Sequence, residues 1–184
     1  MNKKAFSTME IVFIGVMAAL IAVCSWISIP TTVPFTLQTF AVFLAVGLLG
    51  GRNGTITVLI YILLGAVGLP VFAGFTGGFG KLLGTTGGYI VGFLLSAVIM
   101  WAFEKFFGKK LWISAIAMVL GLIACYAVGT AWFMVVYARN TGEITLLTTL
   151  SWCVFPFILP DMIKIALALL LSNRLRVAIP AFNK

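Results

Sequence analysis

Long apolar segments run along most of the chain, and short stretches rich in glycine, proline or polar residues separate them. A helix that crosses the hydrocarbon core of a membrane needs about 20 mainly apolar residues. The pattern predicts about six membrane-spanning helices, at 11–29, 37–49, 55–69, 87–103 and 111–138 and within 144–171. The last segment is too long for one straight span. We therefore expect Pro156 and Pro160 to break it, and the sixth helix to begin near Pro160 or one or two turns earlier.

The composition agrees with this pattern. Hydrophobic residues make up 62% of the 184 residues and charged residues only 9%, which leaves too little polar surface for a soluble domain. We therefore predict an all-α integral membrane protein, folded as one compact helical bundle over residues 1–184.

The distribution of lysine and arginine predicts the orientation of the bundle. With six spans, both termini lie on the same side of the membrane. Nine basic residues then share that side, and Lys81, Arg139 and Lys164 lie on the other. Because basic residues accumulate on the cytoplasmic side, both termini should be cytoplasmic. The nine are Lys3, Lys4, Arg52, Lys105, Lys109, Lys110, Arg174, Arg176 and Lys184.

The sequence offers little for catalysis or for a cofactor. Histidine is absent, and Cys24, Cys125 and Cys153 lie singly in apolar runs, so we predict no metal site, no disulfide and no cofactor. The glycine-rich stretch at 71–88 has neither the P-loop spacing nor the dinucleotide-binding spacing. We therefore predict neither an ATPase nor another enzyme.

Asp161 and Lys164 form the strongest candidate site. They are three residues apart, so they share one helix face. If the membrane ends at Asn173, Asp161 lies about 18 Å up the helix, in the outer half of the bilayer. The pair could be structural, with Asp161 complementing the helix dipole and Lys164 snorkelling outward. We favour a binding site, because ionisable groups at this depth are costly and typically functional.

Other stretches supply weaker candidates. The proline-bounded loop at 30–36 and the glycine-rich stretch should meet Asp161 at the outer face, where Gln38 and Tyr89 could line a pocket or face the interface. Ala18 and Ala22 are four residues apart, and small residues at this spacing let another helix approach closely. Spacing alone leaves open whether that helix belongs to the same bundle or to a partner.

Four segments together resemble a known family. They are VPFTLQT at 33–39, PVFAG at 70–74, LLGTTGGY at 82–89 and PFILPDMIK at 156–164. In this order they resemble the BioY family, the biotin-binding S components of energy-coupling-factor (ECF) vitamin transporters. The resemblance covers most of the chain. It implies six helices, a bacterial cytoplasmic membrane, and capture of biotin from outside the cell.

The resemblance also implies partners and a division of roles at the site. The partners are a membrane scaffold protein, which would dock on the Ala18 and Ala22 face, and two cytosolic ATPases. Biotin carries a ureido ring, a thioether ring and a carboxylate. We expect Asp161 to accept a ureido N–H, and Lys164 to bind the carboxylate or the ureido carbonyl. The remaining candidates are Thr36, Gln38 and Tyr89 as polar groups, Gly77, Gly78, Gly87 and Gly88 as points of close backbone approach, and Trp26 or Phe79 as apolar walls.

Three alternatives remain at this point. The chain could be an S component for a different vitamin, with the same architecture and another pocket. It could also be an ion- or proton-coupled transporter that uses Asp161 as the carrier group. A membrane enzyme or structural subunit is disfavoured, because the catalytic groups are missing.

Overall fold

The computed structural model describes residues 6–178 of the chain. Within them the regular secondary structure is helical apart from one short antiparallel pair, β1 (Ser28–Ile29) and β2 (Phe35–Thr36), and an isolated bridge between Phe72 and Thr76. The helices are α1 (Thr8–Trp26), α2 (Gln38–Leu49), α3 (Gly51–Ala66), α4 (Phe79–Leu83), α5 (Gly87–Phe107), α6 (Leu111–Asn140), α7 (Leu146–Cys153) and α8 (Phe155–Ala178).

Each of the six predicted segments corresponds to a helix, and α4 and α7 are short additions. Four helices, α1, α5, α6 and α8, are long and apolar enough to cross a membrane. At 1.5 Å per residue α2 is about 18 Å long and α3 about 24 Å long, which is less than a hydrocarbon core of about 30 Å. The predicted helical membrane fold is present, apart from the short β1–β2 pair. The count of six membrane-spanning helices stays a prediction.

The break before the last helix falls earlier than Pro160. The chain leaves helical geometry at Val154, where φ is −127°, and α8 begins at Phe155. Pro156 therefore lies in the first turn, where its missing N–H removes no helical hydrogen bond. The helix continues through Pro160, so the prediction that this proline interrupts the helix is wrong. The expected start one or two turns before Pro160 is confirmed.

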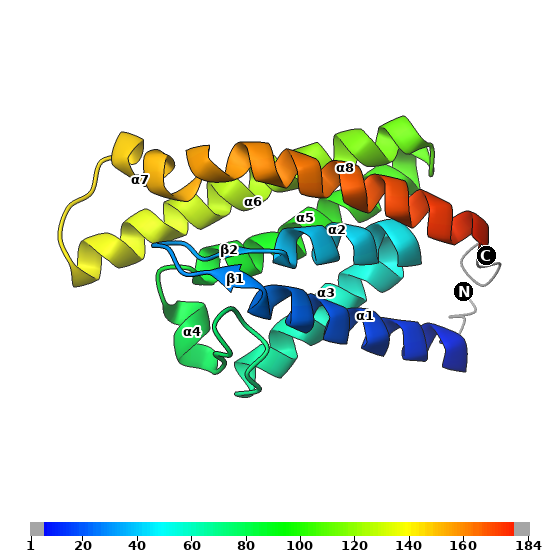
Figure 1. Cartoon of the computed structure of the whole chain (residues 1–184), viewed down its shortest axis with the longest axis horizontal. Coiled ribbons are helices and arrows are strands. Elements are labelled where there is room, and N and C mark those ends of the chain that lie inside the picture. The colour runs from blue at the N-terminus through cyan, green and yellow to red at the C-terminus, as the bar shows by residue number, and fades with distance from the viewer. Residues whose placement is uncertain (1–5, 179–184) are drawn as a thin grey trace.

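The long helices run side by side along the longest axis of the molecule (Figure 1), with α2 between α1 and α8. The α5–α6 pair has the most extensive contact, and small residues along its interface let the two helices approach closely. Ser96 Oγ donates a hydrogen bond of 2.6 Å to the carbonyl of Gly121 across it. A Cβ atom on Gly92 would come within 2.9 Å of Cys125 Sγ. This close contact fixes the wall from which several cavity residues project.

One end of the bundle gathers most of the described cations, and we call it the basic end. Glu104 Oε2 accepts a hydrogen bond of 2.6 Å from Gly51 N, and Arg176 Nε donates one of 3.2 Å to the carbonyl of Leu48. These bonds join the ends of α2, α5 and α8 to the start of α3. The start of α1 and the end of α8 lie on the same side of the molecule (Figure 1). The cations of the basic end are Arg52, Lys105, Lys109, Lys110, Arg174 and Arg176.

This asymmetry matches the predicted charge distribution, because Lys81, Arg139 and Lys164 lie on segments toward the other end. Lys3, Lys4 and Lys184 fall outside the described residues. The cytoplasmic orientation of both termini remains a prediction.

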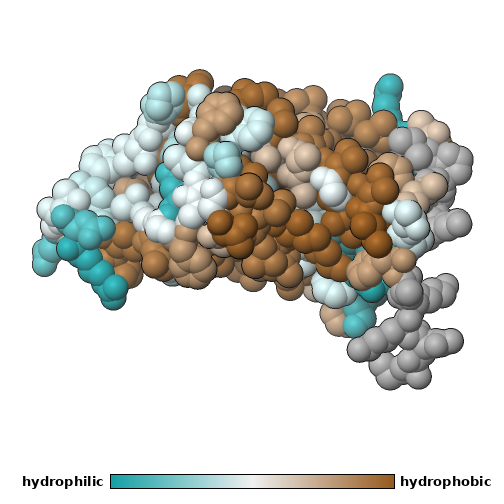
Figure 2. Space-filling model, turned by 90° about the horizontal axis from the view of Figure 1, so that it is seen from below, coloured by the Kyte–Doolittle hydropathy of each residue, from teal (hydrophilic) through white to brown (hydrophobic). Residues whose placement is uncertain are grey.

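The face of the bundle seen in Figure 2 is apolar over its middle and hydrophilic at one end. An apolar middle is what contact with lipid requires. Ala18 and Ala22, predicted to face a partner, are instead buried inside the bundle, with exposed fractions of 3% and 5%. Gly15 and Ala19 occupy the exposed side of α1.

Candidate functional site

A cavity lies between the end of α8 opposite the basic end, α5, α6, α2 and the segments around α4 and β2. Its lining atoms enclose about 690 Å³, part of which is open to solvent. Most of the lining is apolar, as in typical small-molecule sites. The lining residues are Val33, Pro34, Thr36, Gln38, Thr39, Phe72, Ala73, Lys81, Thr86, Tyr89, Ile90, Phe93, Leu122, Cys125, Tyr126, Cys153, Phe157, Asp161 and Lys164.

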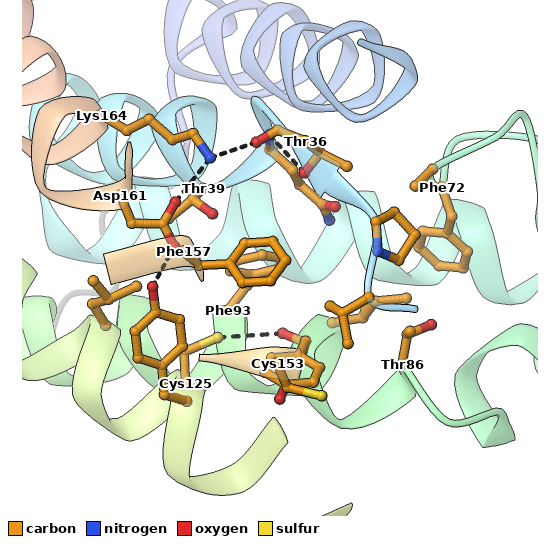
Figure 3. A pocket seen from close by; sticks show the side chains of 18 of the residues that line it. Thr36, Thr39, Phe72, Thr86, Phe93, Cys125, Cys153, Phe157, Asp161 and Lys164 are labelled. Carbon is orange, nitrogen blue, oxygen red and sulfur yellow. Dashed lines mark hydrogen bonds and ion pairs between the residues drawn. The ribbon is translucent and has the colours of Figure 1, made fainter. Parts of the chain in front are cut away.

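Asp161 and Lys164 line one side of the cavity (Figure 3). Their exposed fractions are 3% and 5%, and Lys164 Nζ lies 2.8 Å from Asp161 Oδ1. The pair forms locally because residues three apart on a helix project from the same face. Tyr126, which reaches across from α6, donates a hydrogen bond of 2.6 Å to Asp161 Oδ2. Both carboxylate oxygens are therefore held in place.

Lys164 has a second anchor outside α8. Its Nζ donates a hydrogen bond of 2.7 Å to the carbonyl of Thr36 and lies 4.1 Å from the centroid of the Phe35 ring. Both residues belong to β2, which is only two residues long. An ammonium has three N–H donors, and two are used by Asp161 and Thr36. The third N–H is free for a ligand or for the face of the Phe35 ring.

The charges of Asp161 and Lys164 neutralise each other, and removing either one should cost considerable free energy. Two charges buried together must satisfy one another, and removing one partner typically costs about 3–5 kcal/mol because the other is left uncompensated. A pre-formed arrangement of this kind can accept and donate hydrogen bonds at adjacent points without rearranging. The geometry suits a ligand that carries N–H donors and a carbonyl side by side.

A second polar group lies along α2. Gln38 Nε2 donates a hydrogen bond of 2.9 Å to the Tyr61 hydroxyl, which in turn donates one of 3.1 Å to the carbonyl of Val71. This chain of bonds orients the Gln38 amide. Neither Gln38 Oε1 nor Thr39 Oγ1 has a hydrogen-bonding partner within the residues that the structure describes. Both remain available to a ligand.

Tyr89 also lines the cavity, as the sequence predicts. Its hydroxyl lies 3.3 Å from Thr130 Oγ1, and its ring packs over Gly129, where a Cβ atom would overlap it. The nearby Cys153 thiol is buried, which raises its pKa above the ordinary value. It therefore contributes a neutral, apolar surface. Among the described residues no cluster could hold a metal ion.

The far side of the cavity contains Phe72 and Thr86 (Figure 3), and Lys81 from α4 also lines the cavity. Lys81 is half-buried and makes no ion pair within the described part of the chain. The cavity lining thus contains both the Asp161–Lys164 pair and an unpaired cation, Lys81. The apolar rings of Phe93 and Phe157 lie between the pair and the far side with Phe72 and Thr86 (Figure 3).

The predicted aromatic walls lie outside the cavity lining. Trp26 Nε1 donates a hydrogen bond of 2.8 Å to the carbonyl of Pro70, and its ring stacks on Phe75 at 4.9 Å. Phe79 is 65% exposed. Phe72, Phe93 and Phe157 provide the walls instead. These aromatic positions cannot be told from other apolar residues by sequence pattern alone.

The four glycines predicted to let the backbone approach the ligand also lie outside the cavity lining. They have a different structural role. Cβ atoms on Gly77 and Gly87 would overlap backbone carbonyls of Leu69 and Leu82, and one on Gly88 would overlap the Trp132 side chain. Gly78 has φ of +90°, a conformation that favours glycine. These glycines shape the walls behind the cavity by letting chain segments approach each other.

Sequence reasoning misses Tyr126, Thr39 and Lys81 as cavity residues. Tyr126 is 35 positions from Asp161 and stands in a long apolar helix that carries no local signal for the pairing. Thr39 stands next to the correctly placed Gln38. For Lys81, the only signal is a lone cation in a glycine-rich stretch.

The fold and the cavity define the protein as a helical membrane protein with a deep site for a small molecule. A family model described as "BioY family" matches residues 1–181. The chain belongs to the BioY family, whose members are transport components rather than enzymes. The apolar helices and these relatives identify it as a multi-pass protein of the bacterial plasma membrane.

Named relatives cover nearly the whole chain. "Biotin transporter BioY" of Thermotoga maritima is 41% identical over 168 residues, which cover 91% of this chain and 95% of the relative. "Probable biotin transporter BioY" of Pyrococcus horikoshii is 37% identical, with coverages of 91% and 96%. A crystal structure of the S-component for biotin from an ECF-type ABC transporter superposes with a TM-score of 0.82 at 30% identity, covering 94% of this chain and 95% of that one.

Proposed function

We propose that the protein is the substrate-binding S component of an ECF-type transporter and that it captures biotin in the cavity described above. The observation that carries this proposal is the buried group of Asp161, Lys164 and Tyr126 at one side of an apolar cavity. Its donors and acceptors match the ureido ring of biotin, and the relatives named as biotin transporters support the choice of ligand.

The ureido ring fits without breaking any bond of the pair. A carboxylate offers about four lone-pair positions, and Tyr126 and Lys164 use two of those on Asp161. Asp161 can therefore accept a ureido N–H as well. The third N–H of Lys164 donates to the ureido carbonyl. We choose the ureido carbonyl over the biotin carboxylate as the acceptor for Lys164. Lys164 Nζ lies only 2.8 Å from Asp161 Oδ1, and the N–H and carbonyl groups of the ureido ring are adjacent, so both can reach the pair together.

The rest of biotin extends away from the pair. The thioether ring contacts the apolar middle of the cavity, where Phe93 and Phe157 lie, and burial of its apolar surface contributes about 25 cal/mol per Å². The carboxylate reaches the opposite side, where Lys81 offers an unpaired ammonium and Thr86 a hydroxyl. Lys81 is less buried than Lys164, so its contribution is the smaller of the two.

Equilibrium titration of the purified protein with biotin tests the proposal. Asp161→Asn and Lys164→Ala should each weaken binding about 30-fold or more, because each leaves a buried charge without its partner. Glu104→Gln is the matched control, since it removes an acidic group that pairs with Lys109 at the basic end. Binding of biotin to both cavity variants as tightly as to the wild type would refute the assignment.

A second arm keeps the test decisive if the cavity variants fold poorly. Wild-type protein is titrated with biotin that is methylated on a ureido nitrogen. The methyl group removes one donor to Asp161, so affinity should fall by a factor of about 10 or more. Equal affinity for both ligands would show that the ureido ring does not face the pair.

We further propose that uptake is driven by ATP through a membrane scaffold protein and two cytosolic ATPases, with the basic end of the bundle in the cytoplasm. The exposed side of α1 at Gly15 and Ala19 is the surface that we assign to the scaffold, because a Cβ atom on Gly15 would meet nothing within 4 Å and small residues permit close helix approach. Gly15→Leu should lower ATP-dependent uptake in reconstituted vesicles and leave biotin binding unchanged. Uptake that follows an ion gradient without ATP would refute this coupling.

A further inference from the structure

A second, shallow groove lies on the outside of the bundle between α2 and α8. About 520 Å³ of open space lies over its lining, which comprises Phe40, Leu167, Leu170, Leu171 and Arg174. It shares no lining residue with the biotin cavity. Apart from the arginine, its wall is hydrocarbon.

The groove lies where α2 and α8 run side by side. The carbonyl of Thr36, just before α2, accepts a hydrogen bond from Lys164, and the carbonyl of Leu48, near the end of α2, accepts one from Arg176, so α2 flanks this half of α8. Positions 167, 170, 171 and 174 recur with the spacing of a single helix face. The three leucines have exposed fractions of 53%, 58% and 40%, so no segment within the described residues covers this face.

Arg174 stands at the end of the groove where α8 approaches the basic end. Its side chain is exposed and has no hydrogen bond or ion pair with the residues that the structure describes. Arg176 differs, because its Nε is bound to the carbonyl of Leu48. Arg174 lies about 10 Å along the axis from Leu167. Its guanidinium can donate two parallel hydrogen bonds to a phosphate.

We infer that this groove binds an anionic phospholipid, with an acyl chain along the leucines of α8 and the phosphate on Arg174. Three features favour a lipid over another protein chain. The groove lies on an exposed apolar side of α8, its leucine wall can contact a hydrocarbon chain, and its one cation stands just beyond the end of the apolar run of α8. Arg174 should favour a headgroup with net negative charge, because the choline cation of a zwitterionic lipid offsets the attraction between the guanidinium and the phosphate.

Native mass spectrometry of the full chain in mild detergent tests this site. Dioleoyl-phosphatidylglycerol and dioleoyl-phosphatidylcholine are added separately, and the lipid-bound fraction is measured. The wild type should bind phosphatidylglycerol about fivefold more tightly, and Arg174→Gln should lose this preference. Arg139→Gln is the matched control, because it removes an exposed cation at the opposite end of the molecule. Biotin titration of each variant confirms that it is folded.

Leu170→Trp provides an independent arm, because the larger side chain fills the groove. It should lower retention of both lipids, whereas Arg174→Gln affects only the anionic one. Equal affinity of the wild type for the two lipids would overturn the inference. So would an equal loss of preference in the Arg174 and Arg139 variants, or a dimer that dissociates on Leu170→Trp, since the groove would then be an interface between copies of the chain.

Discussion

Tyr126→Phe is the sharpest test of how the site works, because it removes one oxygen atom and leaves the ring in place. The lost hydroxyl donates the 2.6 Å hydrogen bond to Asp161 Oδ2. A hydrogen bond to a charged group is worth about 1.5–3 kcal/mol. Asp161 would then be held by Lys164 alone and could rotate away from the position that receives the ureido N–H. We therefore expect biotin affinity to fall by a factor of about 10–100.

The measurement is isothermal titration of biotin into purified variants, accompanied by thermal unfolding without ligand. Tyr137→Phe is the control, because Tyr137 lies on the same helix and stacks on Phe133, and its hydroxyl has no hydrogen-bonding partner among the described residues. It should bind biotin like the wild type. If Tyr126→Phe changes affinity by less than twofold, or if both variants lose affinity equally, Tyr126 does not position Asp161.

Three further predictions concern the other parts of the site. Lys81→Met should lower the affinity for biotin several-fold but leave the affinity for biotin methyl ester unchanged, and an equal loss for both ligands in titrations would contradict a carboxylate contact. Gly87→Ala should lower the free energy of unfolding by about 1–3 kcal/mol, and with it the unfolding temperature, because the new Cβ atom would overlap a carbonyl of α4. Gly80→Ala is the control and should leave the unfolding temperature unchanged, because its Cβ atom would meet nothing within 4 Å. Equal shifts in the two melting curves would refute the explanation. Lys164→Met alone should destabilise the unliganded protein by about 3–5 kcal/mol, and adding Asp161→Asn should restore part of this loss; a double variant less stable than the single one would show that the charge pair is not the source.

The Asp161–Lys164 pair shows which features of the site can be predicted from local sequence. Its geometry depends only on a helix that runs through positions 161 and 164, and the apolar run around them predicts that helix. Gln38, Thr36 and Tyr89 could be predicted from the sequence for a similar reason, since each stands where a polar group interrupts or begins an apolar segment. All five residues line the cavity. Their contacts with biotin remain a proposal.

The sequence by itself determined that the chain forms apolar helices, where most of them lie, and that one acid–base pair is carried deep into the bundle. It did not determine which side of each helix faces inward. In lipid the outer face of a helix is as apolar as the inner one, so hydrophobic periodicity loses the information that it carries in soluble proteins. The spacing of Ala18 and Ala22 therefore left open whether they pack inside the bundle or face a partner; the family resemblance implied a partner, and the structure buries both residues inside the bundle. Only the tertiary structure brought Tyr126 to Asp161 and Lys81 into the cavity lining, because both placements join segments distant in sequence and depend on how the helices pack against one another.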